Sequence, residues 1–305
     1  MTTLIITQVL NGLQFGLMLF LIATGLTLIL GIMDFVNLAH GSLYMMGAYA
    51  TATLVAKGMG FFPALLGGVL ATFAVGVVIE VVVVRKLYRR DHLDHVLATF
   101  GIILAFNEVV RIIWGPVGLT FDPPEQFADS VDLLGFTYPA YRLLVIGMIS
   151  LVGAGLWWLV TRTRIGMQIR AGATHPEIVS ALGVNIRALK TTLFALGAAL
   201  AAFSGALIGP LRSVQPGMGE EVLIQALVVI IVGGIGAIRG ALVAGILLGL
   251  LDTLGRAFLP LMISRFANPE VAQAVGPALA SMMIYLTMAL VLVFKPAGLL
   301  PATGK

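Results

Sequence analysis

Runs of about twenty apolar residues recur along this chain and decide what it can fold into. They lie at 4–31, 36–56, 62–84, 96–114, 139–160, 191–211, 222–236, 241–261 and 272–294. A helix needs about 20 apolar residues to cross the roughly 30 Å of hydrocarbon in a bilayer. Only 10% of the 305 residues are charged, whereas about a quarter are charged in soluble domains. We therefore predict an integral membrane protein.

Two of these runs are interrupted. The run 36–56 carries Asn37, His40 and Gly41 near its start, and the run 222–236 ends at the glycine-rich stretch Gly233–Gly240. Either can form a broken or re-entrant helix instead of a full crossing. The predicted fold class is an all-α polytopic bundle of about 8–10 transmembrane or re-entrant helices, in one transmembrane domain that covers residues 1–305.

Loop charges predict the orientation of the bundle. The loop 85–90 and the segment 162–190 are rich in Lys and Arg, whereas the loop 122–132 carries four acidic and no basic residues. Cytoplasmic loops of membrane proteins are enriched in Lys and Arg. We expect both basic segments and the C-terminus inside and the acidic loop outside. The side of the N-terminus stays open, because it depends on whether 36–56 crosses fully.

The sequence argues against an enzyme. Cysteine is absent, which excludes disulfides, thiolate metal sites and a cysteine nucleophile. No Walker A pattern is present, and the run Gly234–Gly240 has the wrong spacing for a dinucleotide fingerprint. His92 and His95 lie among aspartates, where we expect a solvated loop and no metal. The net charge of +4 comes from loop arginines, not from a nucleic-acid-binding face.

The basic segment 162–190 contains a short predicted helix. Thr174 and Glu177 have the spacing of a capping box, and Gly183 can supply a left-handed stop. About two turns between them carry apolar residues, and a helix this short is unstable alone in water. It must cover its apolar side with a partner protein, with its own membrane domain, or by lying on the bilayer.

Asp34, Asn37 and His40 recur at three-residue spacing at membrane depth or at its edge. Polar groups there are expensive unless they face protein or water. They can line a cavity, or they can form an interfacial loop in which Asp34 caps the next helix. Both interpretations stay open from the residues alone.

Four stretches of the chain resemble a known family. The run 31–49, GIMDFVNLAHGSLYMMGAY, resembles the signature of branched-chain amino acid ABC transporter permeases of the LivH type. The loop 164–171, continued through Glu177 and 181–183, and the run 232–241 are similar to further motifs of that family, as is the closing run 294–301. The motifs do not separate branched-chain amino acid permeases from relatives for urea, amides, aromatic amino acids or small carboxylates.

The resemblance implies a permease subunit of an ATP-binding-cassette importer in a bacterial inner membrane, forming half of the translocation path. Its implied partners are the bilayer, a homologous second permease, two ATPase subunits and a periplasmic or lipid-anchored binding protein. ATP would be bound and hydrolysed by the ATPase subunits, so this chain needs no cofactor. The segment at about 162–190 would be the coupling loop.

The resemblance and the residue patterns together give two sets of candidate residues. The expected ATPase-coupling residues are Arg164, Gly166, Arg170, Thr174, Glu177, Ile178, Ala181, Leu182 and Gly183. The expected translocation-path residues are Asn37, His40, Gly41, Gln225, Gly233 and Gly236.

A self-sufficient ion-coupled transporter, or a channel, is the alternative function. An ion-coupled transporter usually uses intramembrane carboxylates, and Glu80, Glu108 and Asp252 are candidates. Glu108 and Asp252 each have an arginine three or four residues ahead, which favours structural ion pairs. Glu80 has no such partner in its helix but lies close to Arg85.

Overall fold

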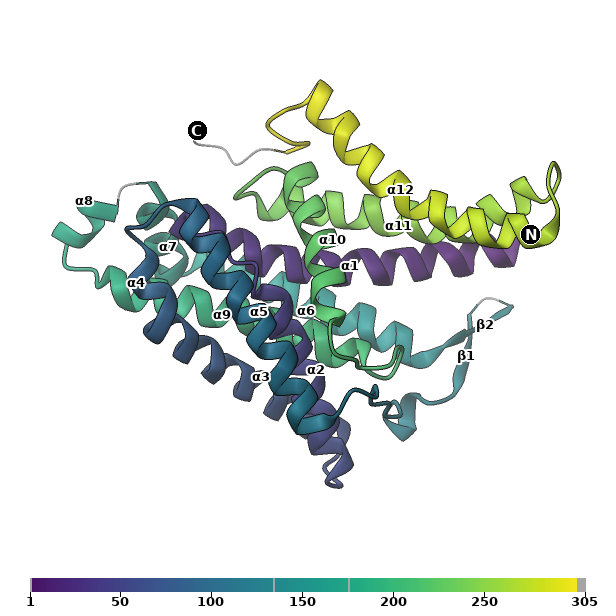
Figure 1. Cartoon of the computed structure of the whole chain (residues 1–305), viewed down its shortest axis with the longest axis horizontal. Helices are drawn as coiled ribbons and strands as arrows, with labels where there is room; N and C mark the ends of the chain where they lie inside the picture. The colour runs from purple at the N-terminus through teal and green to yellow at the C-terminus, as the bar shows by residue number, and fades with distance from the viewer. Residues whose placement is uncertain (1, 134, 175, 301–305) are drawn as a thin grey trace. The chain divides into compact units, whose positions relative to one another are not determined.

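The computed structural model describes residues 2–133, 135–174 and 176–300, which are mostly helical (Figure 1). The long helices are α1 (Thr2–Met33), α3 (Phe61–Ile79), α5 (His92–Trp114), α6 (Ala140–Arg162), α9 (Ile186–Ile208), α11 (Ile238–Ile263) and α12 (Pro269–Phe294). The shorter ones are α2 (His40–Ala56), α4 (Arg85–Leu87), α7 (Arg164–Thr174), α8 (Pro176–Ala181) and α10 (Met218–Gly233). A π-helical turn, η1 (Glu80–Val84), joins α3 to α4.

Seven helices in the described part of the chain are long and apolar enough to cross a membrane. The two interrupted runs instead form the 17-residue α2 and the 16-residue α10. Each predicted apolar run therefore corresponds to one helix, with ends that differ by a few residues. The predicted all-α polytopic fold is confirmed.

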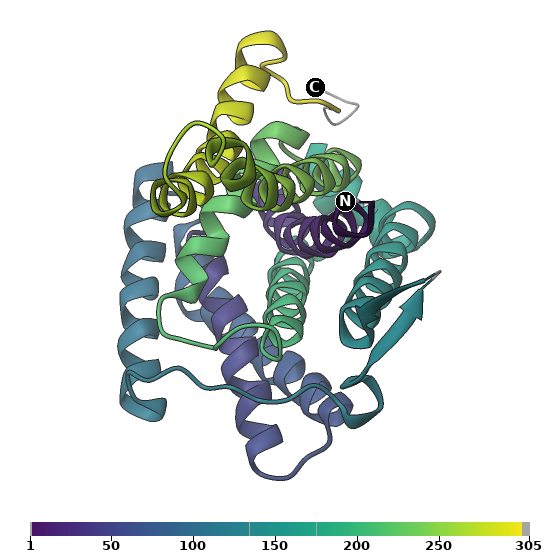
Figure 2. The same cartoon turned by 90° about the vertical axis from the view of Figure 1, so that its right-hand side faces the viewer.

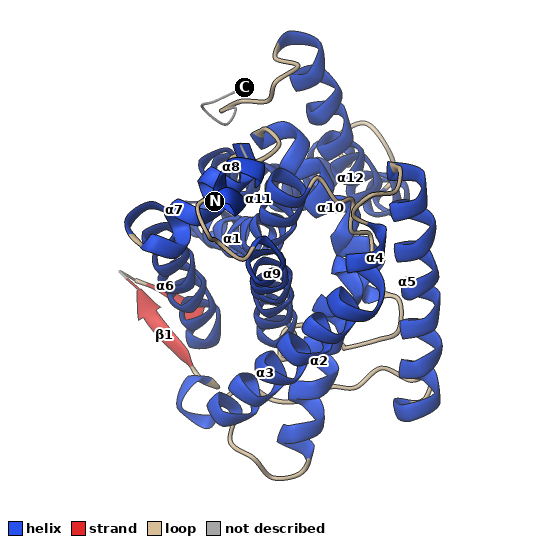
Figure 3. Cartoon of the chain, turned by 90° about the vertical axis from the view of Figure 1, so that its left-hand side faces the viewer, coloured by secondary structure: helices blue, strands red, loops and turns tan. Residues whose placement is uncertain are grey.

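A small β-hairpin was not predicted. Strands β1 (Ser130–Leu133) and β2 (Phe136–Pro139) pair antiparallel, with Ser130 opposite Pro139 (red in Figure 3). Gly135 makes the connecting turn with a φ of +93°, which is the left-handed region that glycine adopts without strain. A short 3-10 turn, η2 (Glu125–Phe127), precedes the hairpin.

The chain divides into two compact units, and α1, α6 and α10 each contribute to both. One unit comprises Thr24–Pro124 and Leu151–Ile224. Its centre is the packing of α2, α3 and α9 on one another, and these three helices lie together in Figure 3. Small residues allow this approach, because a side chain on Gly47 would collide with Ala202, and one on Gly205 with the backbone of Tyr44.

The other unit comprises Met1–Ala23, Glu125–Ser150 and Gln225–Lys305. Here α11 packs along α12, as the yellow-green and yellow helices of Figure 2 show. The first part of α1 lies against α11 through glycines, since a Cβ on Gly16 would collide with the backbone of Gly245. Most of the apolar side chains of α12 are exposed, as expected for a face that meets lipid.

The interrupted run 36–56 becomes helical four residues later than predicted. Asp34 has a φ of +50°, a left-handed conformation that Asp tolerates better than most residues, and it ends α1. Residues 34–37 are non-helical, and α2 begins at His40 without a side-chain cap. Asp34 therefore turns the chain between the two helices and does not cap the second one.

Candidate functional site

The expected coupling loop forms two helices. Thr163 caps the first, α7, by accepting a hydrogen bond from the Gly166 amide at 3.1 Å. Gly166 lies directly against the backbone carbonyls at the end of α6, where no side chain would fit. Arg170 reaches back to the carbonyl oxygen of Val160. Gly166 and Arg170 thus fasten α7 to the end of α6, and Arg164 is exposed at its start.

The second helix, α8, ends as predicted. Gly183 has a φ of +88° and donates to the carbonyl of Ser180, while Val184 donates to that of Val179. This pair of bonds is the Schellman motif, in which glycine is the usual left-handed residue. Ala181 is the last residue of α8.

The start of α8 differs from the prediction. Thr174 ends α7, and α8 begins at Pro176, so the two helices are separated only by residue 175. His175 and the Thr174 side chain lie outside the described residues, so the predicted capping contact with Glu177 stays a prediction. Glu177 itself is exposed in the first turn of α8.

Apolar side chains of this segment face solvent. Ile178 is 59% exposed and Leu182 is 77% exposed, and they lie four residues apart on one side of the segment. Ile165 and Met167 of α7 are also exposed. Val179 is buried. The segment therefore holds itself in place through one side and leaves an apolar side uncovered.

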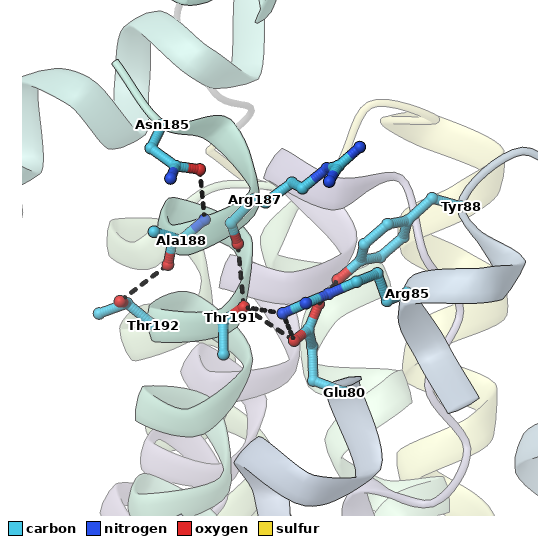
Figure 4. Close-up of polar contacts among 8 residues, drawn as sticks. All are labelled: Glu80, Arg85, Tyr88, Asn185, Arg187, Ala188, Thr191 and Thr192. Carbon is cyan, nitrogen blue, oxygen red and sulfur yellow. Dashed lines mark hydrogen bonds and ion pairs between the residues drawn. The ribbon is translucent and has the colours of Figure 1, made fainter. Parts of the chain in front are cut away.

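The predicted cytoplasmic loop 85–90 and the second turn of α9 meet within one unit at a polar cluster around Glu80 (Figure 4). Arg85 donates to both oxygens of the Glu80 carboxylate, at 3.3 and 2.9 Å. The Tyr88 hydroxyl donates to Oε1 at 2.8 Å, and the Thr191 hydroxyl donates to Oε2 at 2.8 Å. Glu80 is fully buried, so a buried charge is paired and fully hydrogen-bonded.

A π-turn explains why Glu80 and Arg85 can pair. Residues five apart do not share a face of an α-helix, where partners are three or four apart. In η1 the Arg85 amide donates to the Glu80 carbonyl, a five-residue step, and this wider turn brings the two side chains together. Burial and then the bond to Glu80 raise the pKa of the Tyr88 phenol, which keeps it a donor.

Three expected path residues lie in the unit that contains α2. Asn37 is 1% exposed, and neither its amide nitrogen nor its amide oxygen has a hydrogen-bond partner among the described residues. His40 is fully buried against Gly25, where a Cβ would lie 3.0 Å from the imidazole. Gly41 is in backbone contact with Gly219, at the start of α10. The starts of the two short helices thus meet.

The other three path candidates belong to the unit that contains α11. Gln225 is half-buried in α10. Gly233 and Gly236 form the break before α11, and Gly236 has a φ of +84°. The C-terminal segment covers this break: the Leu299 amide donates to the Val232 carbonyl at 2.8 Å, and the Leu300 amide donates to that of Gly233 at 3.2 Å. Packing of the chain on itself accounts for these glycines.

A cluster around Arg142 was not predicted. Arg142, in the first turn of α6, donates to the amide oxygens of Asn11 at 2.9 Å and Gln14 at 3.1 Å. The Tyr138 hydroxyl also donates to Asn11, at 3.0 Å. No carboxylate pairs with Arg142 among the residues that the structure describes. The sequence did contain a signal for this cluster, because Arg142 is the sole basic residue between positions 115 and 161.

Two further ion pairs join residues that the sequence analysis had already paired. Arg111 pairs with Glu108 at 3.1 Å on an exposed surface, and Arg256 pairs with the buried Asp252 at 2.9 Å. The prediction that both histidines lie in a solvated loop is wrong for His95. Its ring is buried in the first turn of α5, with Nε2 2.9 Å from the carbonyl of Leu87.

Comparisons with known proteins cover nearly the whole chain. A family profile described as "Branched-chain amino acid transport system / permease component" matches residues 8–292. The permease protein BraD of the high-affinity branched-chain amino acid transport system of Pseudomonas aeruginosa is 29% identical, over 96% of this chain and 94% of BraD. No solved structure matches the chain.

Two further relatives agree. The high-affinity branched-chain amino acid permease LivH of Escherichia coli K12 is 26% identical, over 83% of this chain and 86% of LivH. A probable LivH of Methanocaldococcus jannaschii is 30% identical, over 78% of this chain and 76% of that protein.

These matches and the membrane-spanning helices identify a multi-pass inner-membrane protein that is not an enzyme, because ATP hydrolysis in this family occurs on separate ATPase subunits. Its assembly includes ATPase and substrate-binding components. The chain belongs to the family of branched-chain amino acid transport system permease components, the transmembrane subunits of ATP-binding-cassette importers.

Proposed function

We propose that this permease pairs with a homologous second permease in an assembly with two ATPase subunits, docks one of them through its α7–α8 segment, and carries branched-chain amino acids. ATP would be bound by those ATPase subunits, and this chain would need no cofactor. The coupling residues would be those from Arg164 to Gly183 named above. The observation that carries the proposal is the uncovered apolar side of α8, formed by Ile178 and Leu182.

Burial against a partner would give this helix its stability. A six-residue helix is too short to persist alone, and α8 is held on its other side by the buried Val179. Covering Ile178 or Leu182 in an apolar groove would contribute about 1.5–3 kcal/mol each. Exposed arginines flank the segment, as expected on the cytoplasmic side where ATP is hydrolysed.

The test is Leu182→Asp in the assembled transporter. The aspartate would place an uncompensated charge in the apolar contact, so the ATPase should no longer co-purify, while membrane insertion stays normal. Ser180→Asp is the matched control, because Ser180 is exposed on the opposite side of the same helix. Retention of the ATPase by Leu182→Asp would refute the docking role.

The translocation path would be lined by Asn37, His40 and Gly41. Gln225, Gly233 and Gly236 belong to the other unit, and their part in a path stays a prediction from the sequence. Asn37 is the best supported of these, because its buried amide has free donors and acceptors among the described residues. Such a group is costly unless water or a solute binds it. Asn37→Leu should therefore reduce uptake without loss of ATPase binding, and normal uptake would remove Asn37 from the path.

The substrate class rests on the relatives. Those with the highest identity are named for branched-chain amino acid transport, whereas a ribose import permease of Escherichia coli K12 is only 23% identical, over 76% of this chain. Mass spectrometry of the ligand that co-purifies with the cognate binding protein should find leucine, isoleucine or valine. Ribose, urea or an amide in its place would overturn the assignment.

A further inference from the structure

A hydroxyl group at the start of α9 bonds to the end of α3. Thr191 lies in the second turn of α9, and its Oγ1 bonds to the Glu80 carboxylate and accepts from Arg85 at 2.9 Å (Figure 4). We propose that this Thr191–Glu80 hydrogen bond is the joint through which movement of the α7–α8 segment reaches helix α3. The inference rests on the docking role proposed above for α8.

The connection from α8 to Thr191 is short and is held by hydrogen bonds and packing. Only residues 182–185 separate α8 from α9, and two of them are held by the backbone bonds of the Schellman motif. Asn185 caps α9 by accepting from the Ala188 amide at 3.0 Å. Leu189 is buried and packs against Gly172 of α7. A displacement of α8 therefore also displaces the start of α9.

Helix α9 packs along α3, and the Thr191–Glu80 bond lies at one end of that packing. One turn before Glu80, Gly76 packs closely against Ala198, an apolar contact with no preferred direction. The Thr191–Glu80 bond adds a directional contact, because hydrogen bonds weaken steeply when they bend. With the bond in place, the first turns of α9 are held to Glu80 at the end of α3. Without it, the first turns of α9 can shift relative to Glu80 while the packing farther along the two helices is kept.

The carboxylate is well placed to hold this bond. Glu80 keeps Arg85 and Tyr88 as partners whether or not Thr191 is present, so its charge stays paired. The Thr191 hydroxyl can donate its one proton to a single strong hydrogen bond, and the Arg187 carbonyl, 2.9 Å away, is a second possible acceptor. The carboxylate is the stronger acceptor, because hydrogen bonds to charged groups are roughly twice as strong. Thr191 is thus a positioning residue, and the rest of the cluster can form without it.

The experiment compares Thr191→Val with Thr192→Val in the complete transporter reconstituted in proteoliposomes. Valine keeps the shape of threonine and replaces its hydroxyl with a methyl group, which cannot form a hydrogen bond. Thr192 is the neighbouring, exposed residue, and among the described residues its hydroxyl bonds only within α9, to the Ala188 carbonyl. The measurements are ATPase co-purification, thermal stability, and the ratio of solute imported to ATP hydrolysed.

We expect Thr191→Val to keep the ATPase bound and to hydrolyse ATP, while uptake per ATP falls about tenfold, the size of effect expected for a lost hydrogen bond to a charged group. Thr191→Ser should restore the ratio, and Thr192→Val should leave it unchanged.

If Thr191→Val leaves the ratio of solute imported to ATP hydrolysed unchanged, the proposed role of the Thr191–Glu80 bond is wrong. Release of the ATPase by that variant would also contradict it. Failure of the docking role would show separately, as ATPase retention by Leu182→Asp.

Discussion

Gly41 in α2 and Gly219 in α10 are in backbone contact, and a Cβ on either would collide with the carbonyl of the other. These glycines join the first turns of the two helices that are too short to be counted as full crossings. The contact explains why the run 36–56 has a glycine near its start, since only glycine lets two helices approach this closely.

The first prediction concerns this contact. Gly41→Ala should lower the stability of the unit by about 1–3 kcal/mol, the usual effect of overpacking. Thermal unfolding in detergent would measure it. Gly101→Ala is the control, because Gly101 lies in α5 with no neighbouring atom near its Cβ position. Equal unfolding temperatures for the two variants would show that the α2–α10 contact can relax.

The second prediction places the N-terminus outside. Asp34 lies 3.9 Å from His92, and the Phe35 ring contacts that of Tyr88, so α1 ends beside the basic loop 85–90. A continuous helix of 32 residues spans about 48 Å, enough to cross a bilayer.

The chain contains no cysteine, so single cysteines report sidedness cleanly. Thr3→Cys and Ser130→Cys should react with an impermeant maleimide from outside, and Lys86→Cys only from inside. Labelling of Thr3→Cys from the cytoplasmic side would contradict the assignment.

The third prediction separates two ion pairs. Glu80→Gln should destabilise the protein by about 3 kcal/mol, at the low end for breaking a buried pair because Arg85 keeps some contact with solvent. Glu108→Gln removes an exposed pair with Arg111 and should cost under about 1 kcal/mol. Chemical denaturation in matched micelles compares the two, and similar losses would mean that the Glu80 cluster is solvated.

The fourth prediction tests the Arg142 cluster. Arg142→Met would leave the amide oxygen of Gln14, a side chain only 3% exposed, without its donor. A buried acceptor that loses its partner costs about 1–3 kcal/mol. Arg265→Met makes the same chemical change at an exposed arginine, so its unfolding temperature should stay close to that of the parent protein. A neutral Arg142→Met would show that water replaces the guanidinium.

Hydrophobic runs predicted the membrane helices well because a bilayer demands long apolar segments whatever the tertiary fold. The two interrupted runs were also correctly singled out, as α2 and α10. The break before α2 was placed early, since the left-handed turn at Asp34 and the non-helical residues after it have no periodic signal.

The polar clusters were harder to predict. Glu80 had no visible partner in its helix because the π-turn changes which residues face each other, and hydrophobic periodicity does not reveal such a turn. Thr191 joins Glu80 from a segment 111 residues away. Arg142 was passed over although its isolation near the start of the predicted span 139–160 was visible in the sequence.

The last prediction concerns Gly183, which ends α8 with a φ of +88°. Alanine there should strain the left-handed turn by about 1 kcal/mol. Because a helix as short as α8 is marginal, this loss should weaken ATPase binding roughly fivefold, since a factor of ten corresponds to about 1.4 kcal/mol. Gly183→Asn should restore most of the binding, because Asn tolerates the left-handed region.

Gly58 offers a matched control. It ends α2 with a φ of +85° and the same two backbone bonds, from Gly58 to Val55 and from Met59 to Leu54. Neither Gly58 nor Gly183 has an atom near its Cβ position, so alanine adds strain without collision at both sites. Gly58→Ala should leave ATPase binding unchanged, because it strains the end of a helix buried in its own unit. Equal ATPase retention by the two alanine variants would mean that the ordered end of α8 does not contribute to docking.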